Sequence, residues 1–191
     1  DVLRGVDLVF LVAGFGGGTG TGASPVIARI AKEEGAVVAS IVSFPFGYER
    51  GRISIAERGL QKLSKFSDSV VIMQNQKLLE YLPDRPFQEA FFVMDQLSAE
   101  LIKGLIETIT QPSLVNLDYA DVKTVLKQKG YAGMMYGETT GGPEDVVRET
   151  LSHPLLEVDY SNATGILIQI TCGQDLAIKD LNTICDGIAQ E

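Results

Sequence analysis

The chain has few of the residues that support metal, disulfide or nucleophilic chemistry. Its 191 residues include two cysteines and one histidine. Cys172 and Cys185 form no CxxC pair, and we expect them to be free thiols in a reducing cytosol. His153 has no partner ligand for a zinc site and cannot serve a Ser–His–Asp triad from its position before Pro154. The sequence therefore predicts no protein-held metal centre and no triad hydrolase.

Long apolar runs and excess positive charge are also missing. No apolar stretch approaches the roughly 20 residues that a membrane-spanning helix needs, and the N-terminus shows no signal-peptide pattern. Acidic residues outnumber basic ones by 25 to 16, which argues against a nucleic-acid-binding surface or a polybasic membrane surface. With 45% hydrophobic residues the chain is too apolar to be disordered. We expect a cytoplasmic globular protein that neither binds nucleic acid nor inserts into membranes.

Strand-like and helix-like patterns alternate in the first part of the chain. The apolar run 7–13 ends in glycines and predicts a strand buried on both faces, as in a parallel sheet. Further strands are predicted at 36–44 and 69–73, and helices at 23–34 and 53–65. Three strand–helix alternations are typical of an α/β fold with a parallel sheet.

A long helix is predicted over 86–110, where apolar residues recur on one stripe. A second region follows, with helices expected at 118–129, 143–151 and 175–189 and strands at 132–137 and 165–171. We therefore divide the chain into a partial nucleotide-binding domain, 1–110, which includes the long helix, and a region 111–191 that holds a loop and part of a smaller α/β domain. We expect both ends to be incomplete, because the sequence opens almost directly into a central strand.

A glycine-rich loop follows the first predicted strand and precedes a helix. Six of the nine residues from Gly14 to Gly22 are glycines. The absence of Cβ atoms lets backbone N–H groups approach an anion, and a helix N-terminus adds partial positive charge. The loop has no lysine for a P-loop and does not fit GxGxxG. It predicts phosphate binding through backbone amides, helped by Mg²⁺ and by hydroxyl donors on Thr19 and Thr21. The residues of this predicted site are Gly16, Gly17, Gly18, Thr19, Gly20, Thr21 and Gly22.

The string GGGTGTG after a buried strand resembles the signature of the tubulin/FtsZ family. Other segments carry the same resemblance, which runs from about residue 7 to 186: Pro45–Glu49, Asn75 with Lys77–Leu79, Glu89–Phe91 with Asp95, Thr110–Pro112 and Leu114–Val122. Members of the family that build the prokaryotic division ring polymerise with GTP. The resemblance therefore implies a self-assembling GTPase that binds GTP and GDP with Mg²⁺.

The resemblance also implies contacts to the nucleoside. Glu49 would accept hydrogen bonds from the ribose, with Arg52 as its basic neighbour, and Asn75 would bond the base or the ribose. Phe91 would stack on guanine. Asp95, one helical turn further on, would accept hydrogen bonds from the guanine N–H and amino groups, which adenine cannot supply in that pattern.

The residues alone leave other interpretations of these positions open. Phe91 fits a core aromatic, Asp95 a solvated helix position and Glu49 an ordinary loop carboxylate. The sequence also departs from the family pattern, since Arg50 stands where glycine is usual and Gln76 where aspartate is usual.

A second set of candidates lies before the helix predicted at 118–129. By spacing alone, Asp118 and Asp121 favour a helix N-terminal cap. The resemblance implies instead that Asn116, Asp118 and Asp121 reach the nucleotide of a neighbouring subunit, where they orient and polarise the attacking water. Two acids and an amide suffice there, because phosphoryl-transfer catalysis is mainly positioning and charge stabilisation.

The functional expectation is a GTPase that forms head-to-tail filaments for cell division and acts at the division site. Its partners would be further copies of itself, together with division proteins and membrane anchors bound through segments absent from this sequence. Since the family's first phosphate loop is also absent, we expect this chain alone to bind GTP poorly. The alternatives are a non-division cytoskeletal member of the family and a nucleotide-binding scaffold without hydrolysis. A third alternative, a dinucleotide-dependent oxidoreductase, is disfavoured because the glycine loop does not fit the GxGxxG pattern.

Overall fold

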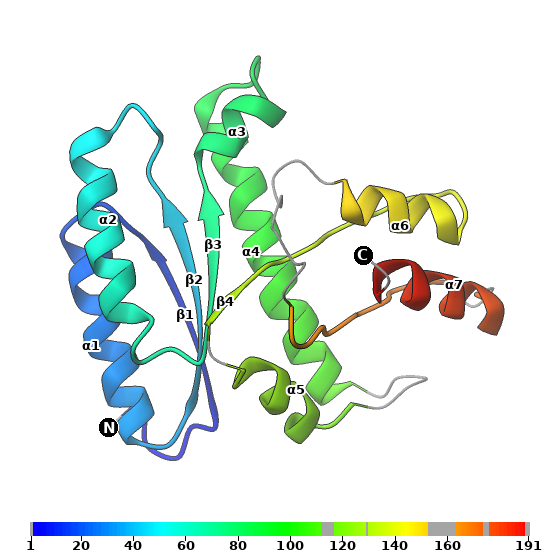
Figure 1. Cartoon of the computed structure of the whole chain (residues 1–191), viewed down its shortest axis with the longest axis horizontal. Helices are drawn as coiled ribbons and strands as arrows, with labels where there is room; N and C mark the ends of the chain where they lie inside the picture. Colours follow the sequence, from blue (N-terminus) through cyan, green and yellow to red (C-terminus); the bar gives the residue numbers. More distant parts are fainter. Residues whose placement is uncertain (1, 112–116, 129, 153–162, 174–175, 190–191) are drawn as a thin grey trace. The chain divides into compact units, whose positions relative to one another are not determined.

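The computed structural model describes residues 2–111, 117–128, 130–152, 163–173 and 176–189 (Figure 1). The chain forms two compact units, Asp1–Ala132 and Gly133–Glu191. The division into domains 1–110 and 111–191 stays a prediction. Within the described residues, no helix combines the length and the apolar character needed to cross a bilayer.

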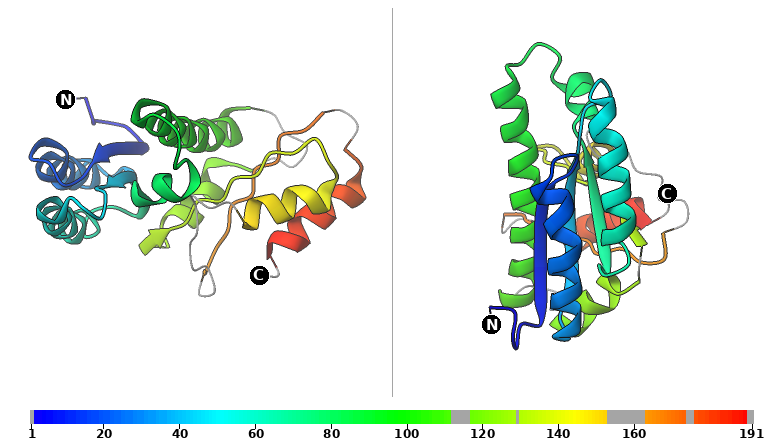
Figure 2. Two further views of the ribbon diagram at one scale, coloured as in Figure 1. Left: turned by 90° about the horizontal axis from the view of Figure 1, so that it is seen from above. Right: turned by 90° about the vertical axis from the view of Figure 1, so that its left-hand side faces the viewer.

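The first unit is built on a four-stranded parallel sheet, which confirms the predicted α/β class. The strand order is β1 (Leu8–Gly14), β2 (Val37–Phe44), β3 (Ser69–Gln74) and β4 (Gly130–Ala132). The described residues of this unit form the helices α1 (Thr19–Glu33), α2 (Arg50–Leu63), α3 (Gln76–Tyr81), α4 (Phe87–Thr110) and α5 (Tyr119–Leu126). Figures 1 and 2 show α1 and α2 side by side on one face of the sheet and α4 on the other.

The core lies between the sheet and the pair α1–α2. β2 is central and almost entirely buried, as its apolar sequence predicts. Val38 and Val42 of β2 pack in one cluster with Ala28 and Ala31 of α1 and with Leu63 of α2. The small alanines let α1 approach the sheet closely.

β1 differs from the expectation in its surroundings. Its continuous apolar run predicts burial on both faces, but β1 is an edge strand of the described sheet, and the side chain of Val12 is 57% exposed. Leu11, whose side chain points to the other face, is buried in the core. The prediction of full burial is therefore wrong for one face of β1.

Several element boundaries also differ from the sequence-based prediction. α1 begins at Thr19, inside the glycine loop, and the short helix α3 was not predicted. The strand expected at 132–137 lies earlier, as β4, and pairs with β3. In the described part of 165–171 no strand forms, because these residues make no ladder with another strand.

The second unit contains two helices that pack on each other, α6 (Pro143–Leu151) and α7 (Ile178–Ala189) (Figure 2). α6 has the predicted bounds, with Pro143 in its first turn. A Cβ added to Gly187 of α7 would lie 2.9 Å from Cγ1 of Val147 of α6, so glycine permits this close packing.

Candidate functional site

The glycine-rich loop lies at the carboxyl end of β1 and leads directly into α1. Gly17, Gly18 and Thr19 are exposed, and a Cβ at either glycine would meet only open space. No side chain caps the N-terminus of α1, and no acidic residue lies in its first turn. The first N–H groups of the helix are therefore available to an anion in front of them.

Two other glycines of the loop are needed for its shape. Gly16 has a φ of +99°, a region that favours glycine. A Cβ on Gly20 would lie 2.2 Å from the carbonyl oxygen of Gly14, so only glycine allows α1 to pass so close to β1. Thr21 is buried, and its hydroxyl oxygen accepts a hydrogen bond from the N–H of Gly16 at 2.9 Å. This side chain holds the loop together and does not point outward.

A second loop, Pro45–Glu49, leaves the carboxyl end of β2. The carboxylate of Glu49 accepts a hydrogen bond from the N–H of Phe46 at 3.1 Å and pairs with the guanidinium of Arg52 at 2.6 Å. The structure thus brings together the two residues expected at the ribose. The side chain of Arg52 is 65% exposed, so the pair lies at the surface.

The start of α3, after β3, forms a third part of the same edge. The backbone N–H of Asn75 donates to the carbonyl of Phe44. Oδ1 of Asn75 is buried and has no hydrogen-bond partner among the described residues. A buried acceptor without a donor is costly, so this atom fits a place where a bound molecule supplies the donor.

Gln76 connects this third part to the second loop. Its Oε1 accepts a hydrogen bond from the N–H of Gly47 at 2.9 Å. The residue that departs from the family pattern therefore has a defined role in this chain, since it holds the Pro45–Glu49 loop against the first turn of α3.

Four aromatic rings gather beside these loops and were not predicted as a group. Phe46 is buried at the centre, stacks on Tyr48 and makes edge contacts with Phe87 and Phe91 of α4, with centroids 5.3 to 5.9 Å apart. Phe91 remains 39% exposed. A ring supported on its inner side and open on its outer side can serve as a stacking surface for a base.

Asp95 lies one turn further along α4. Its side chain is exposed. The structure therefore places Phe91 and Asp95 on one helix, with the carboxylate accessible to hydrogen-bond donors.

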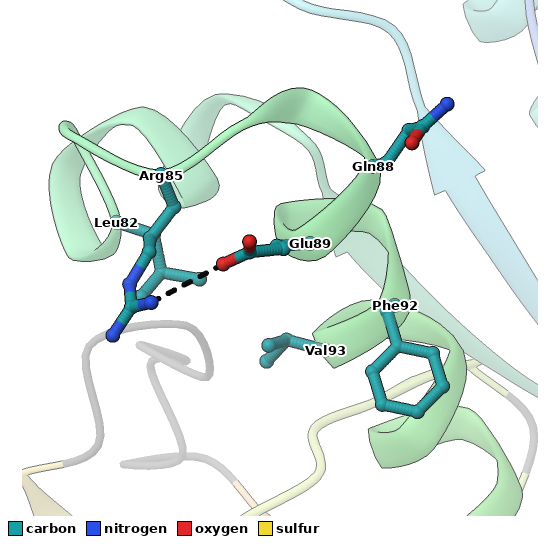
Figure 3. A pocket seen from close by; sticks show the side chains of 6 residues that line it. All are labelled: Leu82, Arg85, Gln88, Glu89, Phe92 and Val93. Atoms are coloured by element: carbon teal, nitrogen blue, oxygen red, sulfur yellow. Dashed lines mark hydrogen bonds and ion pairs between the residues drawn. The ribbon is translucent and has the colours of Figure 1, made fainter.

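A shallow hollow at the start of α4 is separate from these candidates (Figure 3). It is lined by Leu82, Arg85, Gln88, Glu89, Phe92 and Val93, and none of these is a predicted site residue. Figure 3 shows the guanidinium of Arg85 directed at the carboxylate of Glu89, 3.2 Å away.

The predicted catalytic acids lie at the beginning of α5. Asp118 caps the helix: its Oδ1 accepts from the N–H of Asp121, and Oδ2 of Asp121 accepts from the N–H of Asp118. Both side chains are exposed, and this capping uses one oxygen of each carboxylate. Asn116 lies outside the described residues.

The two sets of candidates lie at opposite ends of the sheet. The glycine loop follows the carboxyl end of β1, whereas the hydroxyl of Tyr119, between the two acids, donates to the carbonyl of Asp7 before the amino end of β1. β1 has seven residues, and at about 3.3 Å per residue a strand of this length spans roughly 20 Å. Within one chain, the acids and the glycine loop do not meet.

Comparison with known proteins shows which family this chain belongs to. The family model described as "Tubulin/FtsZ family, GTPase domain" matches residues 1–83, and that described as "FtsZ family, C-terminal domain" matches residues 130–191. The Cell division protein FtsZ 2 of Haloferax volcanii is 52% identical over 192 residues, covering 100% of this chain and 48% of that protein. The chain belongs to the tubulin/FtsZ family.

Other members of the tubulin/FtsZ family match with similar coverage. The Cell division protein FtsZ 2 of Methanocaldococcus jannaschii is 48% identical over 100% of this chain and 52% of that protein. The solved structure titled "FtsZ dimer, empty", from M. jannaschii, superposes with a TM-score of 0.87 and 38% identity over 96% of this chain and 54% of that chain. The chain thus spans about half the length of the curated relatives it matches.

Sequence reasoning missed the residues that support the site. Phe46 and Tyr48 follow the proline that ends β2, and this aromatic pattern is the signal that could have indicated a ring cluster. The inward direction of Thr21 and the hydrogen bond from the N–H of Gly47 to Gln76 depend on loop geometry, for which a single sequence contains no signal.

Proposed function

We propose that this chain forms part of a GTPase that assembles head to tail, with one copy holding the nucleotide and the next supplying the acids. The observation that carries the proposal is the position of the two sets of residues. The glycine loop and the Asp118–Asp121 pair lie at opposite ends of one parallel sheet. A contact that joins opposite ends of identical subunits propagates as a filament and does not close as a dimer.

The carboxyl edge of the sheet has the chemistry for a guanine nucleotide. The uncapped N-terminus of α1 and the exposed Gly17 and Gly18 suit phosphate oxygens. Oδ1 of Asn75 is buried without a partner in the described part of the chain, and it suits a donor on the base or ribose. Phe91 offers a partly exposed ring, and Asp95 an acceptor that favours guanine over adenine.

Mg²⁺ would supply charge stabilisation at the phosphates. The glycine loop contains no lysine, so it would bind phosphate through backbone N–H groups and the hydroxyl of the exposed Thr19. We propose that the GTP and GDP complexes contain this ion, held with the phosphate oxygens in front of α1.

The acids would act on the water from the neighbouring copy. Capping of α5 uses Oδ1 of Asp118 and Oδ2 of Asp121, so the second oxygen of each carboxylate can accept a hydrogen bond from that water. The capping interpretation and the catalytic one are therefore compatible, because the cap fixes the side chains that would orient the water. Asn116 would complete the set.

We further propose that the whole protein acts in cell division, in the cytoplasm at the division site, with division proteins and membrane anchors as partners. Relatives that carry the name Cell division protein FtsZ support this role. The position of the two sets at opposite ends of the sheet fits self-assembly, given the catalytic role that the family resemblance implies for the acids.

The test is the release of phosphate from GTP by the full-length protein at increasing protein concentration. If the site is completed between copies, turnover per protomer is near zero at low concentration and rises above a threshold. A turnover per protomer that is independent of concentration would contradict the shared site. Binding of GTP without any phosphate release would favour a scaffold.

A further inference from the structure

Two side chains in the first turn of α5, Tyr119 and Val122, hold this helix against the rest of the first unit. The phenol hydroxyl of Tyr119 donates to the carbonyl oxygen of Asp7 at 2.6 Å, across 112 positions of sequence. Val122 is fully buried. The ammonium of Lys123 lies over the ring of Tyr119, 5.5 Å from the ring centroid.

These attachments lie on one face of the helix. Tyr119 and Val122 are three residues apart, so their side chains share a face. Asp118 and Asp121 are also three residues apart and lie on the adjacent face, about 100° around the helix axis. A helix held by one apolar contact can still rotate about its axis, whereas a directional hydrogen bond beside that contact fixes the rotation.

We propose that Tyr119 is a positioning residue for the catalytic acids. Its hydrogen bond to the carbonyl of Asp7 sets the direction in which the side chains of Asp118 and Asp121 point out from the surface of the subunit. This inference rests on the proposed function of the two acids. The hydroxyl touches neither nucleotide nor water; it acts through the orientation of α5.

The substitution Tyr119→Phe tests this role cleanly. It keeps the ring and removes one hydroxyl. The carbonyl of Asp7 still accepts a hydrogen bond from the N–H of Val37 at 2.8 Å, so no buried acceptor is left without a partner. We therefore expect the variant to fold.

The measurement is made on the full-length protein with GTP, comparing turnover at saturating GTP, the critical concentration for assembly, the affinity for GTP and the melting temperature. We expect turnover per assembled protomer to fall about threefold to tenfold, since one hydrogen bond sets the geometry. Critical concentration and affinity for GTP should stay within about twofold of wild type.

Two matched controls separate positioning from general effects. Tyr131→Phe removes the phenol hydroxyl of a 63% exposed tyrosine in the same unit and should leave turnover unchanged. Ser67→Ala removes a buried hydrogen bond to Ser40, 2.7 Å long, and should lower the melting temperature without the fall in turnover.

The outcomes are distinguishable from failure of the proposed function. Wild-type turnover in Tyr119→Phe, with turnover lost in Asp121→Asn, would overturn the positioning role and leave the shared site standing. An equal fall in Tyr119→Phe and Ser67→Ala would also overturn it, as a mere loss of stability. Full turnover in Asp121→Asn would overturn both.

Discussion

At the scale of single residues, the aromatic cluster makes the clearest prediction about nucleotide binding. Phe91 contacts Phe46 on its inner side and is 39% exposed. If its outer face stacks on guanine, Phe91→Ala should weaken GTP binding by about 1–2 kcal/mol, in the range of base–aromatic stacking. Fluorescence titration of the full-length protein with a labelled GTP analogue measures this.

The neighbouring residue supplies the control. Phe92 is 61% exposed and lines the hollow of Figure 3. Phe92→Ala should bind GTP as wild type does. Equal losses in both variants would contradict a specific role of Phe91.

Tyr119 makes a prediction about pH. Partial burial, with smaller contributions from the charges of Asp7 and Asp68, raises the pKa of Tyr119 above 10.0. The folded state therefore favours the neutral phenol, which can donate to the carbonyl of Asp7. The ammonium of Lys123 lies over the same ring, and Asp68 is itself paired with Lys32.

The sign of the effect follows from this raised pKa. The contribution of Tyr119 to stability is fully present below about pH 10, the pKa of the unfolded chain, and is lost as the pH rises through the folded value. Urea unfolding of wild type and Tyr119→Phe from pH 8 to 11 should show a difference of about 1 kcal/mol that shrinks above pH 10. A difference that grows above pH 10 would contradict the hydrogen bond.

At the scale of elements, the contact between α1 and β1 depends on one glycine. A Cβ at position 20 would lie 2.2 Å from the carbonyl oxygen of Gly14, and backbone cannot give way as a side chain can. Gly20→Ala should therefore destabilise the protein by about 1–3 kcal/mol, as overpacking does. Thermal unfolding measures this.

Gly18 is the matched position for that test. It lies two residues earlier, with open space around its missing Cβ and a φ of −74°. Gly18→Ala should change stability by less than about 0.5 kcal/mol. A larger loss from Gly18→Ala than from Gly20→Ala would show that the close approach of α1 to β1 does not limit stability.

The elements also show how far the sequence predicts the fold. β1, β2, β3, α2 and α4 are found close to their predicted positions, because long apolar runs and helical stripes are local signals. β4 and the expected strand 165–171 were misjudged, because a strand exists only where a neighbour can pair with it. The pairing of β4 with β3 joins residues about 60 positions apart, and no local pattern contains that information.

For the candidate site, the sequence predicted candidate residues but not where their side chains point. The glycine loop was identified by residue type and spacing. The pair Glu49–Arg52 was expected only through the family resemblance, and the structure brings that pair together. Three features were not predicted: the inward direction of Thr21, the hydrogen bond from the N–H of Gly47 to Gln76, and the hydrogen bond from Tyr119 to Asp7. Each depends on where a side chain points after the chain has folded.

At the scale of the whole molecule, we propose that one copy holds the nucleotide and the next supplies the acids. Two variants test the two halves separately. Gly18→Asp places a carboxylate in open space before α1, where it should repel phosphate without disturbing the fold. Asp121→Asn removes the charge of one acid while leaving the glycine loop intact.

The most direct measurement is phosphate release from GTP by an equal mixture of the two full-length variants. Each variant alone should be nearly inactive: the first because it binds little GTP, and the second because it cannot activate water. In mixed filaments, an Asp121→Asn copy that holds GTP can meet the intact acids of a Gly18→Asp neighbour, so we expect turnover well above that of either variant alone. A mixture no more active than the sum of its parts, with mixed filaments demonstrated by sedimentation, would contradict the shared site.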